Sequence, residues 1–189
     1  VSIEDLIADE SVVITISHAG YIKRTNLSEY KTQNRGGVGQ KSAGTRDQDF
    51  LEHMFVATNH QYMMFFTQKG KCFWMRVYEI PEGSKTAKGR AIQNLVNIES
   101  DDKVKAFICT QDLKDKEYIA KHNLVMVTKQ GQVKKTSLGK YSKPRTNGVA
   151  AITIKEGDEL IGAQLTNGES QIILVVKSGK LVRFEETKT

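Results

Sequence analysis

Hydrophobic and polar positions follow one pattern that occurs four times along the chain. Each occurrence is an apolar run, a short polar turn that ends in glycine, and a second run rich in β-branched and aromatic residues. Such runs are typical of strands, and glycine supplies the positive φ that tight hairpin turns need. The four segments are VVITISHAGYIKRT, YMMFFTQKGKCFWM, LVMVTKQGQVKKT and IILVVKSGKLVRF. We therefore predict four β-hairpins that turn at Gly20, Gly70, Gly131 and Gly179.

The connections between these hairpins also repeat. A basic loop with glycine follows each of the first three hairpins: NRGGVGQK, AKGRAIQN and PRTNGVAAI. An acidic cluster then leads into a further strand, as in ESDDKVKAFICT. Several strands in a period of about 50 residues indicate propeller-like blades. We predict a lead-in from a preceding domain over 1–10, with a short helix near Ser2, and repeats at roughly 11–57, 58–108, 118–165 and an incomplete 170–189.

A closed propeller usually needs at least four blades. The sequence holds three complete units and the beginning of a fourth, so we expect it to be part of a longer domain. Its 28 Lys and Arg against 22 Asp and Glu give a net charge of +6, which is compatible with a polyanionic partner but identifies none. Cys72 and Cys109 form no CxxC pair, so we expect a reducing cytosol rather than a disulfide scaffold. The acidic N-terminus does not resemble a signal peptide, and no run is long enough to span a membrane.

Catalytic signatures are missing from the sequence. The histidines form no HExxH pair, and GSKTAKGR has the wrong glycine spacing for a phosphate loop. No tyrosine has a recognisable catalytic setting. We therefore predict no catalytic residue, no metal site and no cofactor in this chain. The histidines considered are His18, His53, His60 and His122.

The glycine-rich stretch QNRGGVGQK has the components of a phosphate-binding loop. Arginine can contact phosphate through two N–H groups, and glycine allows the backbone to approach an anion closely. Gln33, Arg35 and Lys41 would supply the side-chain donors. On this loop alone, a flexible turn explains the glycines equally well.

Repetition of the basic residues favours binding over a flexible turn. Equivalent positions of successive blades lie along one rim, so a charge repeated in each blade forms a basic band. Such a band suits duplex DNA, whose phosphates dominate binding. The alternative is that solvated strand ends simply carry Lys and Arg. The predicted rim residues are Lys23, Arg24, Lys31, Lys41, Arg76, Lys88, Arg90, Lys134, Lys135, Lys143, Arg145 and Arg183.

The chain resembles, over essentially its whole length, the C-terminal DNA-wrapping domain of DNA gyrase A, which belongs to the type IIA topoisomerases. The resemblance rests on IEDLIADESVVITISHAGYIKRTNLSEYKTQNRGGVG and GKCFWMRVYEIPEGSKTAKGRAIQNL. The gyrase A box of that family corresponds to Gln33, Asn34, Arg35, Gly36, Gly37, Val38 and Gly39. Asn34 and Val38 stand where the family pattern has basic residues.

The resemblance implies an all-β pinwheel, a propeller variant with strand-exchanged, four-stranded blades. About three and a half of its usual six blades would be present here. It implies sequence-independent wrapping of double-stranded DNA with positive handedness, which enables gyrase to introduce negative supercoils. The catalytic tyrosine, ATP and Mg would lie elsewhere in an A2B2 holoenzyme, which contains the N-terminal part of gyrase A and also gyrase B. The expected location is the bacterial cytoplasm, at the nucleoid, without membrane contact.

Two alternatives remain at this point. The corresponding domain of topoisomerase IV would bind DNA without strong wrapping. A propeller-type protein-interaction module would carry its charge incidentally and would not bind DNA.

Overall fold

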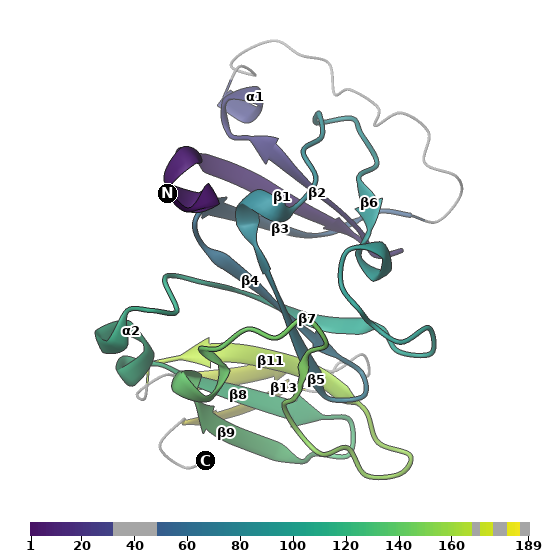
Figure 1. Cartoon of the computed structure of the whole chain (residues 1–189). Helices are drawn as coiled ribbons and strands as arrows, with labels where there is room; N and C mark the ends of the chain where they lie inside the picture. The colour runs from purple at the N-terminus through teal and green to yellow at the C-terminus, as the bar shows by residue number, and fades with distance from the viewer. Residues whose placement is uncertain (32–48, 168–170, 176–180, 186–189) are drawn as a thin grey trace.

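A computed structural model describes residues 1–31, 49–167, 171–175 and 181–185, and strands dominate them (Figure 1). The strands are β1 (Ser11–Ser17), β2 (Tyr21–Asn26), β3 (Leu51–Thr58), β4 (Tyr62–Thr67), β5 (Lys71–Arg76), β6 (Arg90–Ala91), β7 (Val104–Thr110), β8 (Asn123–Thr128), β9 (Val133–Ser137), β10 (Val149–Ala150), β11 (Leu160–Thr166), β12 (Gln171–Val175) and β13 (Leu181–Glu185). The helices are α1 (Ser28–Lys31) and α2 (Lys116–Lys121), with 3-10 turns η1 (Ile3–Leu6), η2 (Val77–Glu79), η3 (Ile92–Asn94) and η4 (Leu138–Tyr141).

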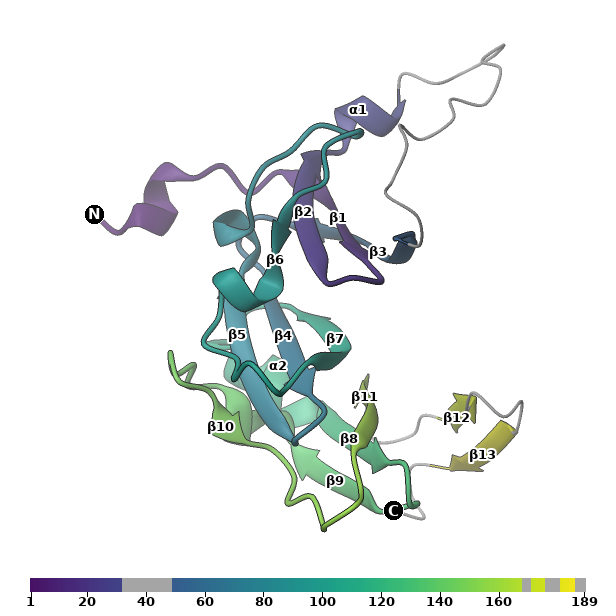
Figure 2. The ribbon, with the colours of Figure 1, turned by 90° about the vertical axis from the view of Figure 1, so that its right-hand side faces the viewer.

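These strands form four antiparallel sheets, which we call blades 1 to 4. Their strand orders are β3-β1-β2-β6, β10-β5-β4-β7, β11-β8-β9 and β12-β13. The fourth strand of blade 1 is β6, which comes from the second sequence unit, and that of blade 2 is β10, from the third. This exchange confirms the predicted all-β, strand-exchanged architecture. The blades follow one another along an arc (Figure 2).

The predicted hairpins are present in all four blades: β1–β2, β4–β5, β8–β9 and β12–β13. Gly20, Gly70 and Gly131 have φ of +87°, +86° and +91°, as the turns require. The fourth predicted turn glycine, Gly179, lies outside the described residues.

The acidic clusters bind the turns of the same blades. An aspartate two residues before each of β3, β7 and β11 accepts the N–H of the residue before the turn glycine. The pairs are Asp49 with Ala19 at 2.9 Å, Asp102 with Lys69 at 3.1 Å, and Asp158 with Gln130 at 2.9 Å. The repeated acidic residues therefore have a structural role that the sequence alone did not indicate.

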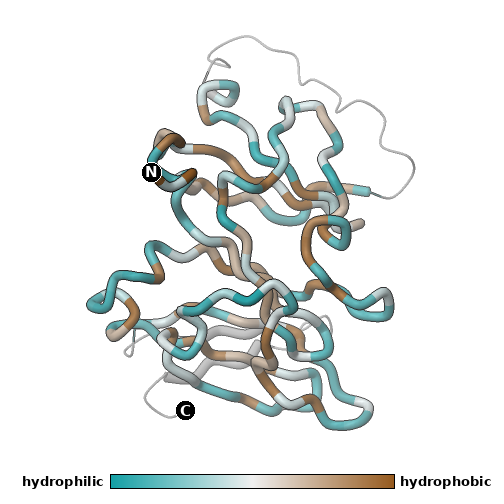
Figure 3. Tube along the Cα trace, in the orientation of Figure 1, coloured by the Kyte–Doolittle hydropathy of each residue, from teal (hydrophilic) through white to brown (hydrophobic). Residues whose placement is uncertain are grey.

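Alternate residues of each central strand pack into two different cores. In β4, Met63 and Phe65 belong to the core between blades 1 and 2, whereas Met64 and Phe66 belong to the core between blades 2 and 3. This follows from the two-residue period of a strand. The strands carry much of the hydrophobic sequence, and the hydrophilic segments gather in the connections (Figure 3).

The helical segments differ from the prediction. The N-terminal helix is only the 3-10 turn η1, in which the Asp5 carboxylate accepts the N–H of Ser2 at 2.9 Å. Helix α2 was not predicted, although Asp115 caps it by accepting the N–H groups of Glu117 and Tyr118. Neither helix in the described part of the chain has the length and apolar character of a membrane span.

Candidate nucleic-acid interface

Two extended segments lie along the outer strands of the first two blades. We call residues 80–91 the first strap and residues 141–150 the second strap. The first strap pairs with β2, where the N–H of Arg24 donates to the carbonyl of Pro81 at 2.8 Å and Ile22 pairs with Arg90. The second strap pairs with β5 through Val149 and Ala150. The straps carry four of the cations predicted to bind DNA: Lys88, Arg90, Lys143 and Arg145.

A glycine brings each strap into close contact with its strand. Gly89 has φ of +85°, and a Cβ there would meet the carbonyl oxygen of Ile22. Gly148 has φ of +70°, and a Cβ there would lie 2.9 Å from the carbonyl oxygen of Cys72. Such contacts are too short for any side chain, so only glycine fits at either position.

Lys23 is not part of an exposed rim, contrary to the sequence prediction. It is only 8% exposed, and its Nζ donates to the carbonyls of Ser84 at 2.9 Å, Lys85 at 2.7 Å and Ala87 at 2.7 Å. Burial lowers the pKa of the Lys23 ammonium group, although the nearby Glu29 carboxylate acts in the opposite direction. The first strap covers this face of β2, which the sequence pattern did not show.

Arg24 and Arg76 also bind the protein itself. The half-buried Arg24 donates from Nε to the carbonyl of Ile80 at 3.1 Å. Arg76 is 8% exposed and forms an ion pair with Glu4 of the N-terminal segment. Its guanidinium also lies 3.8 Å from the centre of the Tyr62 ring and donates to a backbone carbonyl. Arg76 therefore fastens residues 1–10 to blade 2, and its placement on the rim is corrected.

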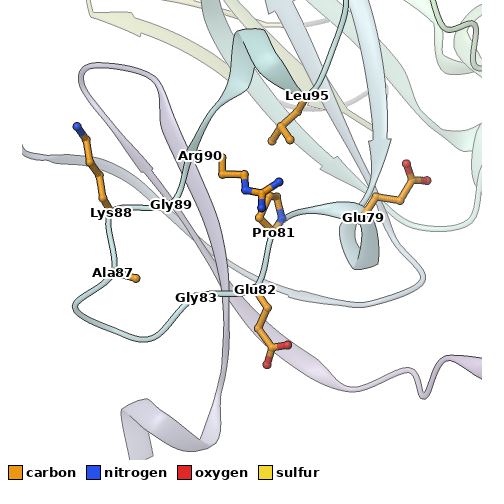
Figure 4. Close-up of a pocket in the computed structure, with 9 residues that line it drawn as sticks. All are labelled: Glu79, Pro81, Glu82, Gly83, Ala87, Lys88, Gly89, Arg90 and Leu95. Carbon is orange, nitrogen blue, oxygen red and sulfur yellow. The ribbon is translucent and has the colours of Figure 1, made fainter.

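The first strap does present cations to solvent. Lys88 and Arg90 are exposed, and Lys88 lies 4.0 Å from the centre of the Tyr21 ring. A cavity of about 580 Å³ lies beneath the strap, and Lys88 and Arg90 both line it; Figure 4 shows the Lys88 side chain extending away from the other labelled side chains, whereas the Arg90 guanidinium lies beside Pro81. The lining also includes the carboxylates of Glu79 and Glu82, so the charge there is mixed.

Lys85 was not among the rim cations predicted from the sequence, although it lies on the first strap. Its ammonium lies 4.8 Å from the centre of the Tyr30 ring, just before the gyrase A box. Lys85 lies in the same GSKTAKGR stretch as Lys88, so the basic character of that stretch was enough to predict both residues as rim cations.

The second strap also carries exposed cations. Lys143 and Arg145 line a cavity of about 450 Å³ together with Lys140, which the sequence reading missed. Lys134 lines it too, but its Nζ donates to the carbonyl of Ala151 at 2.9 Å. Lys135 is half-buried in β9.

The cations of the two straps do not occupy equivalent positions. Arg90 and Val149 are the equivalent residues, because they pair with Ile22 and Cys72. Lys88 directly precedes Gly89, whereas Asn147 precedes Gly148. The basic character therefore recurs without a fixed register, which corrects the position-by-position match expected from sequence.

The remaining predicted site residues cannot be placed in the same detail. The gyrase A box, residues 33–39, and Lys41 lie outside the described residues. Lys31 ends α1, and Arg183 lies in β13 opposite Ile173. Their binding roles stay predictions.

The described residues include no group of three or more His, Cys, Asp or Glu that could hold a metal ion. Both cysteines are free. Burial raises the pKa of the Cys72 thiol well above its ordinary value and that of Cys109 to about 11, so neither is a ready thiolate at neutral pH. His60 and His122 contact backbone carbonyls of Ile7 and Tyr118.

The family comparison and the comparison with curated proteins point to the same family. A family described as the DNA gyrase C-terminal domain, beta-propeller, matches residues 11–58, 61–111 and 122–167. DNA gyrase A of Salmonella typhimurium strain LT2 is 41% identical over 98% of this chain, which spans 21% of that relative. A crystal structure of the C-terminal domain of DNA topoisomerase IV has a TM-score of 0.75 and 28% identity over 96% of this chain and 54% of that one. A DNA gyrase A C-terminal domain has a TM-score of 0.66 and 23% identity, over 93% and 55% of the two chains, and shows the shared fold.

Proposed function

Because this chain belongs to the family of DNA gyrase C-terminal β-propeller domains, we propose that it binds double-stranded DNA along the edge that carries its straps. The binding would be independent of sequence and would wrap the duplex. The observation that carries the proposal is the pair of straps, on successive blades, with exposed cations Lys88 and Arg90 on one and Lys143 and Arg145 on the other.

Electrostatic contact with phosphates fits this arrangement better than base recognition. The cations sit on short extended segments, and no described helix is long enough to read a groove. Their positions differ between the two straps, as a backbone-binding surface tolerates. Duplex DNA has a persistence length of about 50 nm, so bending it around a small domain costs several kcal/mol, which many phosphate contacts together can offset.

Binding to long duplex DNA at several salt concentrations tests the first part of the proposal. Each phosphate that the protein neutralises contributes about 0.9 to the steepness with which log affinity falls against log salt. We expect a steep slope and little difference between unrelated sequences. An affinity that does not change between low and moderate salt would contradict the proposal. It would also be contradicted if this chain bound a protein partner and showed no affinity for DNA.

Wrapping needs a separate test, because the topoisomerase IV domain has a higher TM-score than the gyrase domain. A nicked circular DNA is ligated in the presence of the chain, and its linking number is measured after the protein is removed. A shift to positive supercoils is expected for wrapping of the gyrase kind. Binding with no shift would favour the topoisomerase IV alternative.

The gyrase A box should matter for the shift more than for binding. We propose that the whole box holds the wrapped segment, namely Gln33, Asn34, Arg35, Gly36, Gly37, Val38 and Gly39. Replacing Arg35, Gly36 and Gly37 with Ala should reduce the linking-number shift more than the affinity. Equal loss of both would count against a specific wrapping role.

The roles of the whole protein are further proposals, since the chain spans about a fifth of its curated relatives. We propose that it serves a gyrase whose catalytic tyrosine, ATP and Mg lie elsewhere, in an A2B2 assembly with gyrase B in the bacterial cytoplasm. Within the chain, residues 1–10 would lead in from the preceding domain and the pinwheel would begin at residue 11. The exposed residues Ile3 and Leu6 of η1 are available for contact with other parts of such an assembly.

A further inference from the structure

Lys23 joins the first strap to the body of blade 1. An ammonium group has three hydrogens, and three strap carbonyls lie within 2.9 Å of this one: those of Ser84, Lys85 and Ala87. The hydroxyl of Thr25, two residues along β2, donates to the next strap carbonyl, that of Gly83, at 2.8 Å. All donors of Lys23 are therefore used by the strap, and none is left for a phosphate.

The cations of the first strap lie on the same segment that Lys23 contacts or directly after it. Carbonyls from a four-residue segment converge on one atom, so the strap bends around the Lys23 ammonium group. On this bend, the Lys88 side chain extends away from the other labelled residues of the strap (Figure 4), and Arg90 pairs with β2. Without the ammonium group, three carbonyl dipoles would face one another with no donor, and the bend would lose its support.

We propose that Lys23 is a positioning residue for DNA binding, which orders the first strap from beneath so that Lys85, Lys88 and Arg90 meet the duplex. Lys23 itself does not touch DNA. This inference rests on the proposed function of the strap edge. The second strap has no such lysine, because Phe73 stands at the equivalent position and contacts Gly148 instead.

The main experiment compares Lys23→Met with Lys88→Met in the full chain. Lys88 is the matched control, an exposed lysine of the same strap whose replacement removes one direct contact. Lys88→Met should lower the salt slope of duplex binding by about 0.9. Lys23→Met should lower it by up to about 2.7, because three strap cations lose their positions together, and should weaken binding about tenfold at moderate salt. Equal effects of the two variants would overturn the proposal.

Two further variants separate positioning from direct contact. Lys23→Arg keeps the charge and could serve a phosphate, but the N–H groups of a guanidinium diverge in one plane and fit three carbonyls that converge on one point less well than an ammonium group does. It should bind as weakly as Lys23→Met. In a chain with Lys85, Lys88 and Arg90 all replaced by Met, adding Lys23→Met should cause no further loss of affinity. Wild-type binding by Lys23→Arg, or an added loss in the second test, would overturn the proposal.

Hydrogen exchange gives a readout that does not depend on DNA. In Lys23→Met, the amides of residues 84–90 should exchange faster while those of β4 and β8 stay protected. If Lys23→Met does not fold, Thr25→Val, which removes only the neighbouring hydroxyl donor, should show the same pattern at smaller amplitude. Unchanged exchange in the strap would overturn the positioning role. A wild-type chain that binds no duplex would instead overturn the proposed function, with strap exchange still deciding whether Lys23 orders the strap.

Discussion

Blades 1 and 2 hold their straps by the same backbone pairing but with different side-chain chemistry. The residue three positions after the turn glycine is Lys23 in blade 1 and Phe73 in blade 2. Lys23 binds strap carbonyls through its ammonium group, whereas the Phe73 ring contacts Gly148 and is buried in the core between the blades. At this one position, the strap is therefore held by polar contacts in blade 1 and by apolar packing in blade 2.

The difference follows from what lies beyond each sheet. The face of blade 2 that carries Phe65 and Phe73 packs against blade 1. The equivalent face of blade 1 carries Thr15 and Lys23, and no described blade packs against it. The repeat thus keeps the same backbone pairing in both blades. The structure packed against each sheet face determines whether an apolar or a polar side chain fits there. Four predictions test this comparison, in order of decreasing effect.

The largest effect is expected where the strap support is also part of the core. Phe73→Ala should lower the free energy of unfolding by about 3–5 kcal/mol, since the ring is 1% exposed. Lys23→Ala should cost about 1–3 kcal/mol, because it mainly leaves carbonyls without a donor. Urea unfolding measures both, with Phe73→Leu as a milder control. Equal losses from the two alanine variants would remove the distinction between the straps.

The two straps should respond alike where their backbones are alike. Gly89→Ala and Gly148→Ala should each cost about 3 kcal/mol, because positive φ is combined with a contact to strand backbone. Gly131→Ala is the matched control: its φ is +91° and its missing Cβ would meet nothing within 4 Å, so about 1–2 kcal/mol is expected. Thermal unfolding would contradict this view if all three variants were equally stable.

A smaller effect concerns the point where each strap begins. Trp74 donates from Nε1 to the carbonyl of Tyr141 at 3.0 Å, as Arg24 donates from Nε to that of Ile80 at 3.1 Å. Trp74→Phe and Arg24→Met should each cost about 1 kcal/mol, the value of a single hydrogen bond. If thermal unfolding showed a loss for only one of them, the equivalence of these two contacts would be rejected.

The smallest effect lies at the hairpin turns, where Asp158 of blade 3 accepts a backbone N–H as Asp49 and Asp102 do in blades 1 and 2. Partial burial opposes ionisation of Asp158, but the Thr128 hydroxyl and the N–H groups of Gln130 and Glu159 hold its carboxyl pKa below the ordinary 3.8. A lowered folded pKa gives stability that is present above the unfolded value and is lost as pH falls through the folded one. The stability difference between wild type and Asp158→Asn should therefore shrink between about pH 5 and about pH 3. A constant difference would contradict the charge-dependent role.

The hairpins and blades were predictable because strands and turns are local features. Alternating apolar runs and the glycines at Gly20, Gly70 and Gly131 specify them without knowledge of distant residues. Strand exchange was expected from the family resemblance and not from periodicity. Helix α2 was missed because it is only six residues long and has no buried residue to give an apolar period.

The site was less predictable because burial of a charge depends on distant partners. Lys23 and Arg76 read as rim cations, yet their partners lie in Ser84–Ala87 and at Glu4, far away in sequence. Nothing near either residue marks it as buried. Lys88, Arg90, Lys143 and Arg145 were correctly expected to be exposed, because polar loops without an apolar period usually are.

Strand exchange has a consequence for how such domains can change during evolution. Because β6 completes blade 1 and β10 completes blade 2, the boundaries of the sequence repeat do not coincide with those of the folded sheets. When one genetic repeat is duplicated or lost, each sheet must be completed by a strand from a different repeat than before. Every sheet stays complete only if that strand pairs with the outer strand already present. The unit that is inherited and the unit that folds are offset by one strand, so adjacent repeats must evolve as compatible pairs.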